Sequence, residues 1–149
     1  MSDKQGSLTI WRGIPIVESL TRYRGGLNFP NGWHWIGTAD STFSEIATPL
    51  REALSHGGSP LPDKLPAGVP TYLRQAGIRR WTDIHAVGTI LITVGRSGSG
   101  IVDLQAIRGR GLKEGLFPVQ NGRFQVGPDD DLVEVLEHAV ETARSADFE

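Results

Sequence analysis

The residues that most clearly suggest chemistry are three consecutive aspartates, Asp129, Asp130 and Asp131, placed directly before a segment with helical periodicity. Acidic side chains at a helix N-terminus accept hydrogen bonds from free backbone N–H groups, and each gains about 0.3–1 kcal/mol from the helix dipole. One aspartate is enough to cap the helix. Three in a row exceed that need, so a second role in binding a basic partner is a hypothesis to test.

The charges of the chain are unevenly distributed, although its formal net charge is only −2. Residues 128–149 contain eight acids and one base, a net charge of −7, whereas the preceding residues contain 14 bases and 9 acids, a net charge of +5. Such asymmetry can mark an acidic docking surface, and it can equally be the solvated face of a terminal helix. The overall balance gives no indication of direct nucleic-acid binding.

Residues for metal, phosphate or nucleophilic chemistry do not occur in the patterns that such sites need. The histidines are far apart in sequence, and Asp129 to Asp131 lack the alternating ligands and central glycine of a calcium loop. The glycine-rich segments 95–100 and 109–115 match neither a P-loop nor a dinucleotide-binding loop. There is no cysteine and no G-x-S-x-G motif. We therefore expect no metal, no cofactor and no catalytic residue.

The elements that position these residues can be predicted from local patterns. Residues 7–12 alternate as a half-buried strand, and residues 89–94 and 101–107 read as two antiparallel strands. Residues 117–126 contain Asn121-Gly122 between apolar residues, which predicts a hairpin. Residues 78–87 can form a helical turn or two, with Trp81 and Ile84 directed inward.

Two helices are predicted with more detail. In residues 41–55, Thr42 and Glu45 fit a capping box, while Pro49 indicates either a kink or a second helix starting there. The C-terminal helix begins at the aspartates and carries an apolar stripe, with Glu134 and Glu137 on its outer face.

Together these elements predict an α+β fold. We expect an antiparallel sheet of four to six short strands, packed on one side by the C-terminal amphipathic helix and the helix near 41–55. The 149 residues fit a single domain, 1–149. No apolar run is long enough to span a membrane and no signal-peptide core is present, so we expect a cytoplasmic protein.

The N-terminal segments SLTIWRG and STFS resemble the arginine and serine elements of ADP-ribosyltransferase toxin domains. The resemblance implies that Arg12 would hold the phosphate of a nicotinamide nucleotide and that Ser44 would order the pocket. The catalytic glutamate has no counterpart, because no glutamate occurs between Glu52 and Glu114. A small NAD-dependent ADP-ribosyltransferase-like toxin domain is therefore the alternative interpretation.

The segments RRWTDIHAVGTILITV, IVDLQAIR and KEGLFPVQNGRFQVGPDDDLVEVLEHAVETAR resemble immunity proteins of bacterial contact-dependent inhibition and related polymorphic-toxin systems. The resemblance covers roughly the last 70 residues and lies in the order of elements rather than in a motif. It implies a non-enzymatic inhibitor that occludes the active site of a cognate toxin domain in the cytoplasm.

An acidic helix face would suit a basic toxin such as a nuclease, because complementary charges speed association. An interface of this kind also needs aromatic or arginine anchors, and for Trp33 and Trp35 packing in the core is the competing role. The predicted partner-binding residues are Asp129, Asp130, Asp131, Glu134, Glu137, Tyr23, Arg24, Trp33 and Trp35.

Overall fold

The structure of the protein, a computed structural model, describes residues 4–22, 28–57, 68–111 and 113–146. In chain order the elements are β1 (Lys4–Trp11), β2 (Ile14–Arg22), β3 (Asn28–Ile36), α1 (Phe43–Ser55), α2 (Thr71–Gln75), the 3-10 helix η1 (Trp81–His85), β4 (Ile90–Arg96), β5 (Val102–Gly109), β6 (Leu116–Val126) and α3 (Leu132–Arg144). None of the described helices is long and apolar enough to cross a membrane.

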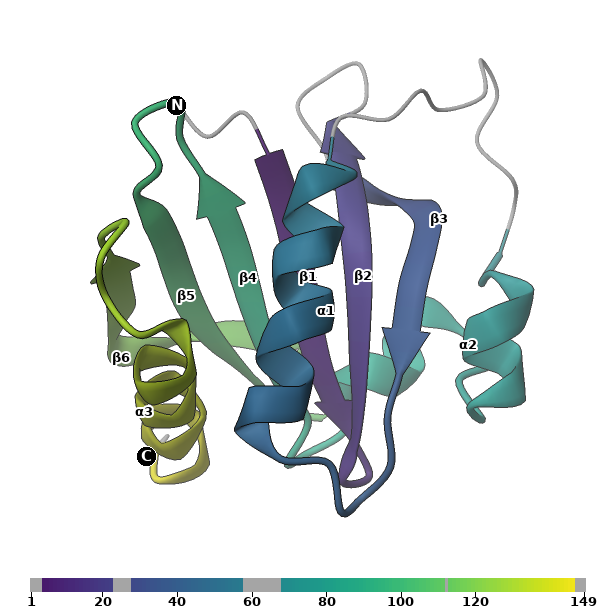
Figure 1. Ribbon diagram of the computed structural model, residues 1–149. Helices are drawn as coiled ribbons and strands as arrows, with labels where there is room; N and C mark the ends of the chain where they lie inside the picture. The colour runs from purple at the N-terminus through teal and green to yellow at the C-terminus, as the bar shows by residue number, and fades with distance from the viewer. Residues whose placement is uncertain (1–3, 23–27, 58–67, 112, 147–149) are drawn as a thin grey trace.

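The six strands form one sheet in the order β3-β2-β1-β4-β5-β6, and every neighbouring pair is antiparallel. Helices α1 and α3 lie on the same face of this sheet, α1 over β1 and β2 and α3 over β5 and β6 (Figure 1). The predicted α+β class, the antiparallel sheet and both packing helices are therefore confirmed.

The main core lies between the sheet and these two helices. Leu8 of β1, Ile92 of β4 and Leu136 of α3 are fully buried there. Successive strand residues point to opposite faces, so Leu8 and Val17 face the helices while Trp11 and Ile16 face away. The alternation predicted for residues 101–107 is confirmed as well, since Leu104 and Ala106 are buried in this core.

The opposite face of the sheet is also partly covered, by a segment for which no packing role was predicted. Trp11 and Ile16 form a second buried cluster with Val69, Leu73 and Ile78 from the segment around α2. This segment passes behind β1 and β2, so both faces of these two strands are buried. Among the described residues, the other end of the same face, behind β4, β5 and β6, stays open.

Helix α1 shows how local signals and packing combine. Its N-cap is Thr42, whose Oγ1 accepts from the Glu45 N–H at 3.2 Å while the Glu45 carboxylate accepts from the Thr42 N–H at 3.0 Å. The predicted capping box is confirmed. The helix then runs through Pro49 to Ser55, so the alternative of a second helix starting at Pro49 is wrong. Ile46, before Pro49, and Leu50, after it, both pack on the main core.

The hairpin predicted at Asn121-Gly122 is wrong. Residues 116–126 form the single edge strand β6, which pairs with β5 on both sides of a bulge. Gln105 faces Arg123 whereas Ile107 faces Pro118, so extra residues of β6 are accommodated there. Asn121 takes the left-handed conformation that a turn would need, with φ 58°, but uses it to form the bulge. The prediction that Trp81 is directed inward is also wrong, because this side chain is 36% exposed.

Candidate partner-binding surfaces

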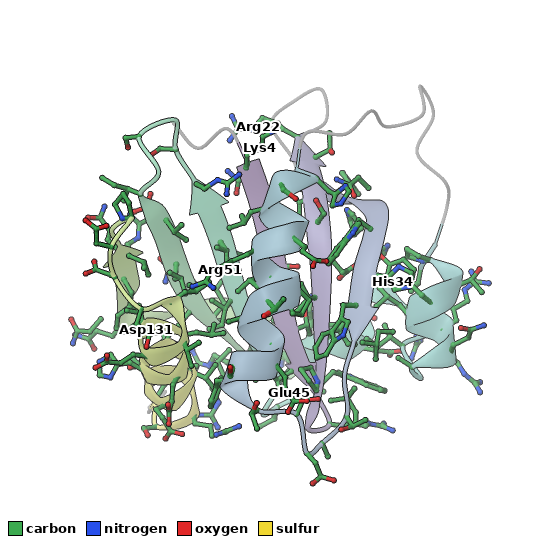
Figure 2. All side chains as sticks on the ribbon, in the orientation of Figure 1. Lys4, Arg22, His34, Glu45, Arg51 and Asp131 are labelled. Atoms are coloured by element: carbon green, nitrogen blue, oxygen red, sulfur yellow. The ribbon has the colours of Figure 1, made fainter. Side chains whose placement is uncertain are left out.

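The three aspartates before α3 have different environments. The Asp131 carboxylate caps the helix, since Oδ1 accepts from the Val133 N–H at 2.9 Å (its position is marked in Figure 2). The Asp130 carboxylate accepts from the Gly127 N–H at 2.7 Å and closes the preceding turn. Asp129 is exposed and has no hydrogen bond or ion pair with any residue that the structure describes. Two of the three aspartates therefore have structural roles, and a role of Asp129 in binding stays a prediction.

The outer face of α3 carries the other two acids predicted to bind a partner, Glu134 and Glu137, and also Glu141. Glu134, Glu137 and Glu141 are exposed and line a groove of about 520 Å³ between α3 and β6. The rest of its lining includes Phe124 and His138, whose rings meet edge to face with centroids 5.1 Å apart. Three carboxylates on one helix face give this groove the chemistry to receive lysine or arginine side chains.

Trp33 and Trp35 lie on the edge strand β3 and are half-buried against the main core. Trp33 also stacks on His56 at the end of α1, with centroids 5.5 Å apart and planes inclined by 19°. Their contacts are those of packing residues. The structure therefore places Trp33 and Trp35 beside α1 and not beside the acidic residues of α3. The predicted anchors Tyr23 and Arg24 lie outside the described residues.

The open part of the second sheet face forms a polar cavity that the sequence reasoning missed. It has a volume of about 650 Å³ and lies across β4, β5 and β6. Two cross-strand hydrogen bonds organise it: the Arg123 Nε donates to Gln105 Oε1, and the Gln125 Nε2 donates to Asp103 Oδ1, each at 2.8 Å. The polar positions alternating with Leu104 in residues 101–107 were the signal that could have revealed it.

A buried carboxylate lies on the covered part of the same face. Glu18 of β2 is only 6% exposed, and its Oε2 accepts a hydrogen bond from the Tyr72 hydroxyl at 2.5 Å. Burial raises the pKa of Glu18, while the Tyr72 hydrogen bond and the nearby His34 oppose that rise. The pKa of Tyr72 is raised as well, by burial first and then by the Glu18 charge. His34, labelled in Figure 2, stacks on the Tyr72 ring with centroids 3.7 Å apart.

This cluster links β2, β3 and α2, and neither cavity is lined by its residues. It therefore has the character of a buried structural contact. Sequence reasoning missed it because Glu18 and Tyr72 are 54 positions apart in the chain.

The arrangement needed by an ADP-ribosyltransferase is not formed by the residues suggested for it. Arg12 lies in the turn between β1 and β2, and its guanidinium stands 4.5 Å above the Trp11 ring. Ser44 lies in the first turn of α1 and not on a strand. Neither residue lines one of the two cavities. Among the described residues, no three His, Asp or Glu side chains gather as metal ligands would.

Comparison with known proteins gives similarity in structure only. No protein-family model matches the sequence, and no curated protein is similar to it in sequence. A protein of unknown function from Neisseria meningitidis has a similar fold, with a TM-score of 0.64 and 13% identity over 97% of this chain and 96% of that one. A chain of the CdiA-CT/CdiI toxin and immunity complex from Yersinia pseudotuberculosis matches with a TM-score of 0.60 and 14% identity over 95% of each chain. At these identities the chain shares the fold of both proteins, over nearly their whole length.

Proposed function

We propose that this protein is a non-enzymatic binding protein that neutralises a cognate bacterial toxin, as immunity proteins of contact-dependent inhibition and other polymorphic-toxin systems do. The observation that carries the proposal is the fold shared with a chain of a toxin and immunity complex over 95% of both chains. The resemblance of the last 70 residues to the same class of protein, in the order of their elements, supports it as well.

The surface proposed for the toxin is the acidic face of α3, formed by Asp129, Glu134, Glu137 and Glu141. These side chains are exposed, and the last three line the groove beside β6. A basic toxin, such as a nuclease, would approach this face faster than a neutral one, because opposite charges steer the encounter. The bound protein would then occlude the active site of the toxin, or a surface beside it, in the cytoplasm of the producing cell.

The proposal is tested by expressing the protein in a bacterial host, alone and together with the toxin domain encoded by the neighbouring gene. We expect normal growth when the protein is expressed alone, and rescue of growth when the toxin is present. Growth arrest by the protein alone, relieved by Arg12→Ala, would instead identify it as a toxin domain and reject the inhibitor role.

The acidic face is tested separately with the double variant Glu134→Lys/Glu137→Lys. The matched control is Asp40→Lys/Glu52→Lys, which changes the net charge equally at exposed positions away from α3. We expect the α3 variant to weaken toxin binding by about tenfold or more at low salt, and the control to change it by less than about threefold. Equal effects of the two variants would show that net charge, and not this face, governs binding.

A further inference from the structure

A second charged surface lies at the corner where the turn between β1 and β2 meets residues 79–81. We call Arg12, Arg79, Arg80 and Trp81 the arginine corner. All four side chains are exposed, and Trp81 keeps 36% of its surface in solvent. Arginine and tryptophan are the residue types most enriched among the energetically dominant contacts of protein interfaces.

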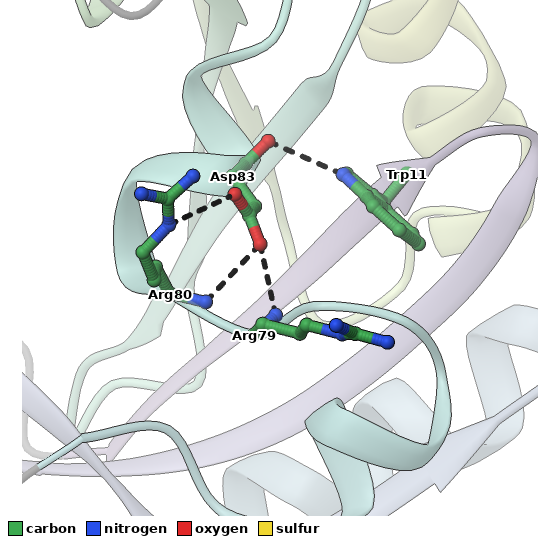
Figure 3. A network of polar contacts seen from close by, with 4 residues as sticks. All are labelled: Trp11, Arg79, Arg80 and Asp83. Carbon is green, nitrogen blue, oxygen red and sulfur yellow. Dashed lines mark hydrogen bonds and ion pairs between the residues drawn. The ribbon is translucent and has the colours of Figure 1, made fainter.

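The backbone of this corner is held by one carboxylate (Figure 3). The Asp83 Oδ2 accepts from the N–H groups of Arg79 and Arg80 at 2.8 and 3.1 Å, and the Arg80 Nε lies 3.8 Å from Oδ1. The Trp11 indole N–H donates to the Asp83 carbonyl oxygen at 3.2 Å, which ties the segment to the sheet. The corner is therefore ordered before any partner arrives, which lowers the entropic cost of binding.

Asp83 leaves most of the positive charge of the corner uncompensated. The Arg79 N–H and then the Arg80 N–H hold the pKa of Asp83 below its usual value, with a smaller contribution from the charges of Arg80 and Arg12. Its carboxylate is thus occupied mainly by backbone groups. Of the three guanidinium groups, that of Arg80 is the one that forms an ion pair with Asp83 among the described residues, and in Figure 3 the Arg79 side chain points away from this carboxylate.

Arg12 adds an observation of a different kind. Its backbone is left-handed, with φ 51°, and Gly13 follows with φ 80°, as in a two-residue type I′ hairpin turn. Glycine and asparagine adopt this conformation more readily than arginine, for which it is strained. Residues with backbone strain of this kind cluster at functional sites, so an exposed and charged residue in this conformation supports a binding role for the corner.

We propose that the arginine corner is an interaction surface for an acidic segment of a protein partner. Guanidinium groups bind carboxylates through paired hydrogen bonds, and the exposed Trp81 supplies apolar area beside them. Single-stranded nucleic acid is a poorer fit, because it needs a continuous basic groove with successive aromatic platforms. The corner offers one exposed indole, on a chain of net charge −2. This surface is opposite in charge to the α3 face and does not depend on the proposed function.

The test uses the full chain and a fluorescein-labelled polyglutamate peptide, with binding measured by fluorescence anisotropy at low salt. The variant Arg79→Glu/Arg80→Glu keeps the backbone N–H groups that bind Asp83, so the corner should remain folded. The matched control Arg22→Glu/Arg51→Glu makes the same change in net charge at exposed positions on β2 and α1. We expect the Kd to rise about tenfold or more for the corner variant and less than about threefold for the control.

Two further variants keep the test decisive. Arg79→Gln/Arg80→Gln removes the charges without adding negative ones, and Trp81→Ala leaves the charge unchanged; both should weaken peptide binding. Thermal unfolding of each variant checks that the fold is retained. Equal weakening of peptide binding by the corner and control variants would overturn the proposal. Tighter binding of an oligothymidylate than of a polyglutamate peptide of equal charge would also overturn it and would indicate a nucleic-acid surface instead.

Discussion

Glu18 is a carboxylate placed where solvation cannot stabilise its charge. It lies in β2 between the sheet and the segment around α2, and its hydrogen-bond donor is the hydroxyl of Tyr72. The titratable groups that face it are Tyr72 and His34, and burial outweighs their stabilising effect, so that its pKa lies above 4.5. The stability of the protein should therefore depend on the protonation of this one residue.

The replacement Glu18→Gln tests that dependence. Because the folded-state pKa is raised, the contribution of Glu18 is fully present below its unfolded pKa and is lost as the pH rises through the folded pKa. Glutamine stays neutral and can still accept from Tyr72. We expect Glu18→Gln to gain stability relative to the parent protein as the pH rises from about 4 to about 8, as measured by urea unfolding. A difference that stays constant over this range would contradict the prediction.

Among the elements, α3 begins with aspartates whose environments differ, although only one residue separates Asp129 from Asp131. Asp131 caps the helix through the Val133 N–H, whereas Asp129 has no hydrogen bond or ion pair with a described residue. Stability and partner binding should therefore respond to different aspartates. Two of the three consecutive acids therefore have a local structural explanation: Asp131 caps the helix and Asp130 closes the preceding turn.

We expect Asp131→Ala to lower the free energy of unfolding by about 1 kcal/mol, because a free N–H at the start of α3 loses its acceptor. Asp131→Asn should recover most of that loss, since asparagine also caps helices well. Asp129→Ala should change the stability by less than about 0.5 kcal/mol. Chemical denaturation measures the free energy of unfolding of the three variants. A large loss of stability for Asp129→Ala would reveal a structural role of this residue.

The other end of α3 is held by a side chain from the sheet. The Arg108 Nη1 of β5 lies 2.8 Å from the Ala146 carbonyl oxygen, 3.1 Å from that of Arg144 and 3.4 Å from that of Ala143. A cation placed at the free carbonyl groups also interacts favourably with the helix dipole. Arg108 therefore joins two elements that are distant in sequence.

We expect Arg108→Ala to destabilise the protein by about 1–3 kcal/mol, because several carbonyl groups lose a charged donor. The loss should appear first as faster amide exchange in the last turn of α3. Arg123→Ala is the control, since Arg123 is exposed and, among the described residues, its side chain bonds only Gln105, across the open sheet face. Equal protection of α3 in the parent protein and Arg108→Ala would show that packing alone holds this helix end.

For the whole molecule, the central strand β1 separates two buried clusters. Leu8 is in the main core with α1 and α3, whereas Trp11 is in the second cluster around α2. β1 pairs with β2 on one side and β4 on the other. A cavity made in this strand therefore affects packing at the centre of the fold.

We expect Leu8→Ala to lower the free energy of unfolding by about 2–5 kcal/mol, because Leu8 is fully buried and its neighbours can fill the space only partly. Ile36→Ala, at the exposed end of the edge strand β3, should cost about 1 kcal/mol or less. Urea denaturation of both variants distinguishes the two sites. Similar losses at Leu8 and Ile36 would mean that the main core is not where the fold gains most of its stability.

Several features followed from the sequence by itself, because they depend on residues a few positions apart. The capping box of Thr42 and Glu45, the helix start at the three aspartates and the alternation in residues 101–107 are all of this kind. The α+β class followed from them. Their physical basis is local, since helix ends need polar caps and amphipathic elements repeat with fixed periods.

Other features were decided only by the tertiary structure. Residues 116–126 became one edge strand because both halves pair with β5, although Asn121-Gly122 favours a hairpin locally. The pairing of Glu18 with Tyr72 and the gathering of the arginine corner depend on segments more than 50 residues apart. Contacts across such separations depend on how layers pack over the sheet, and no periodicity in the chain encodes them.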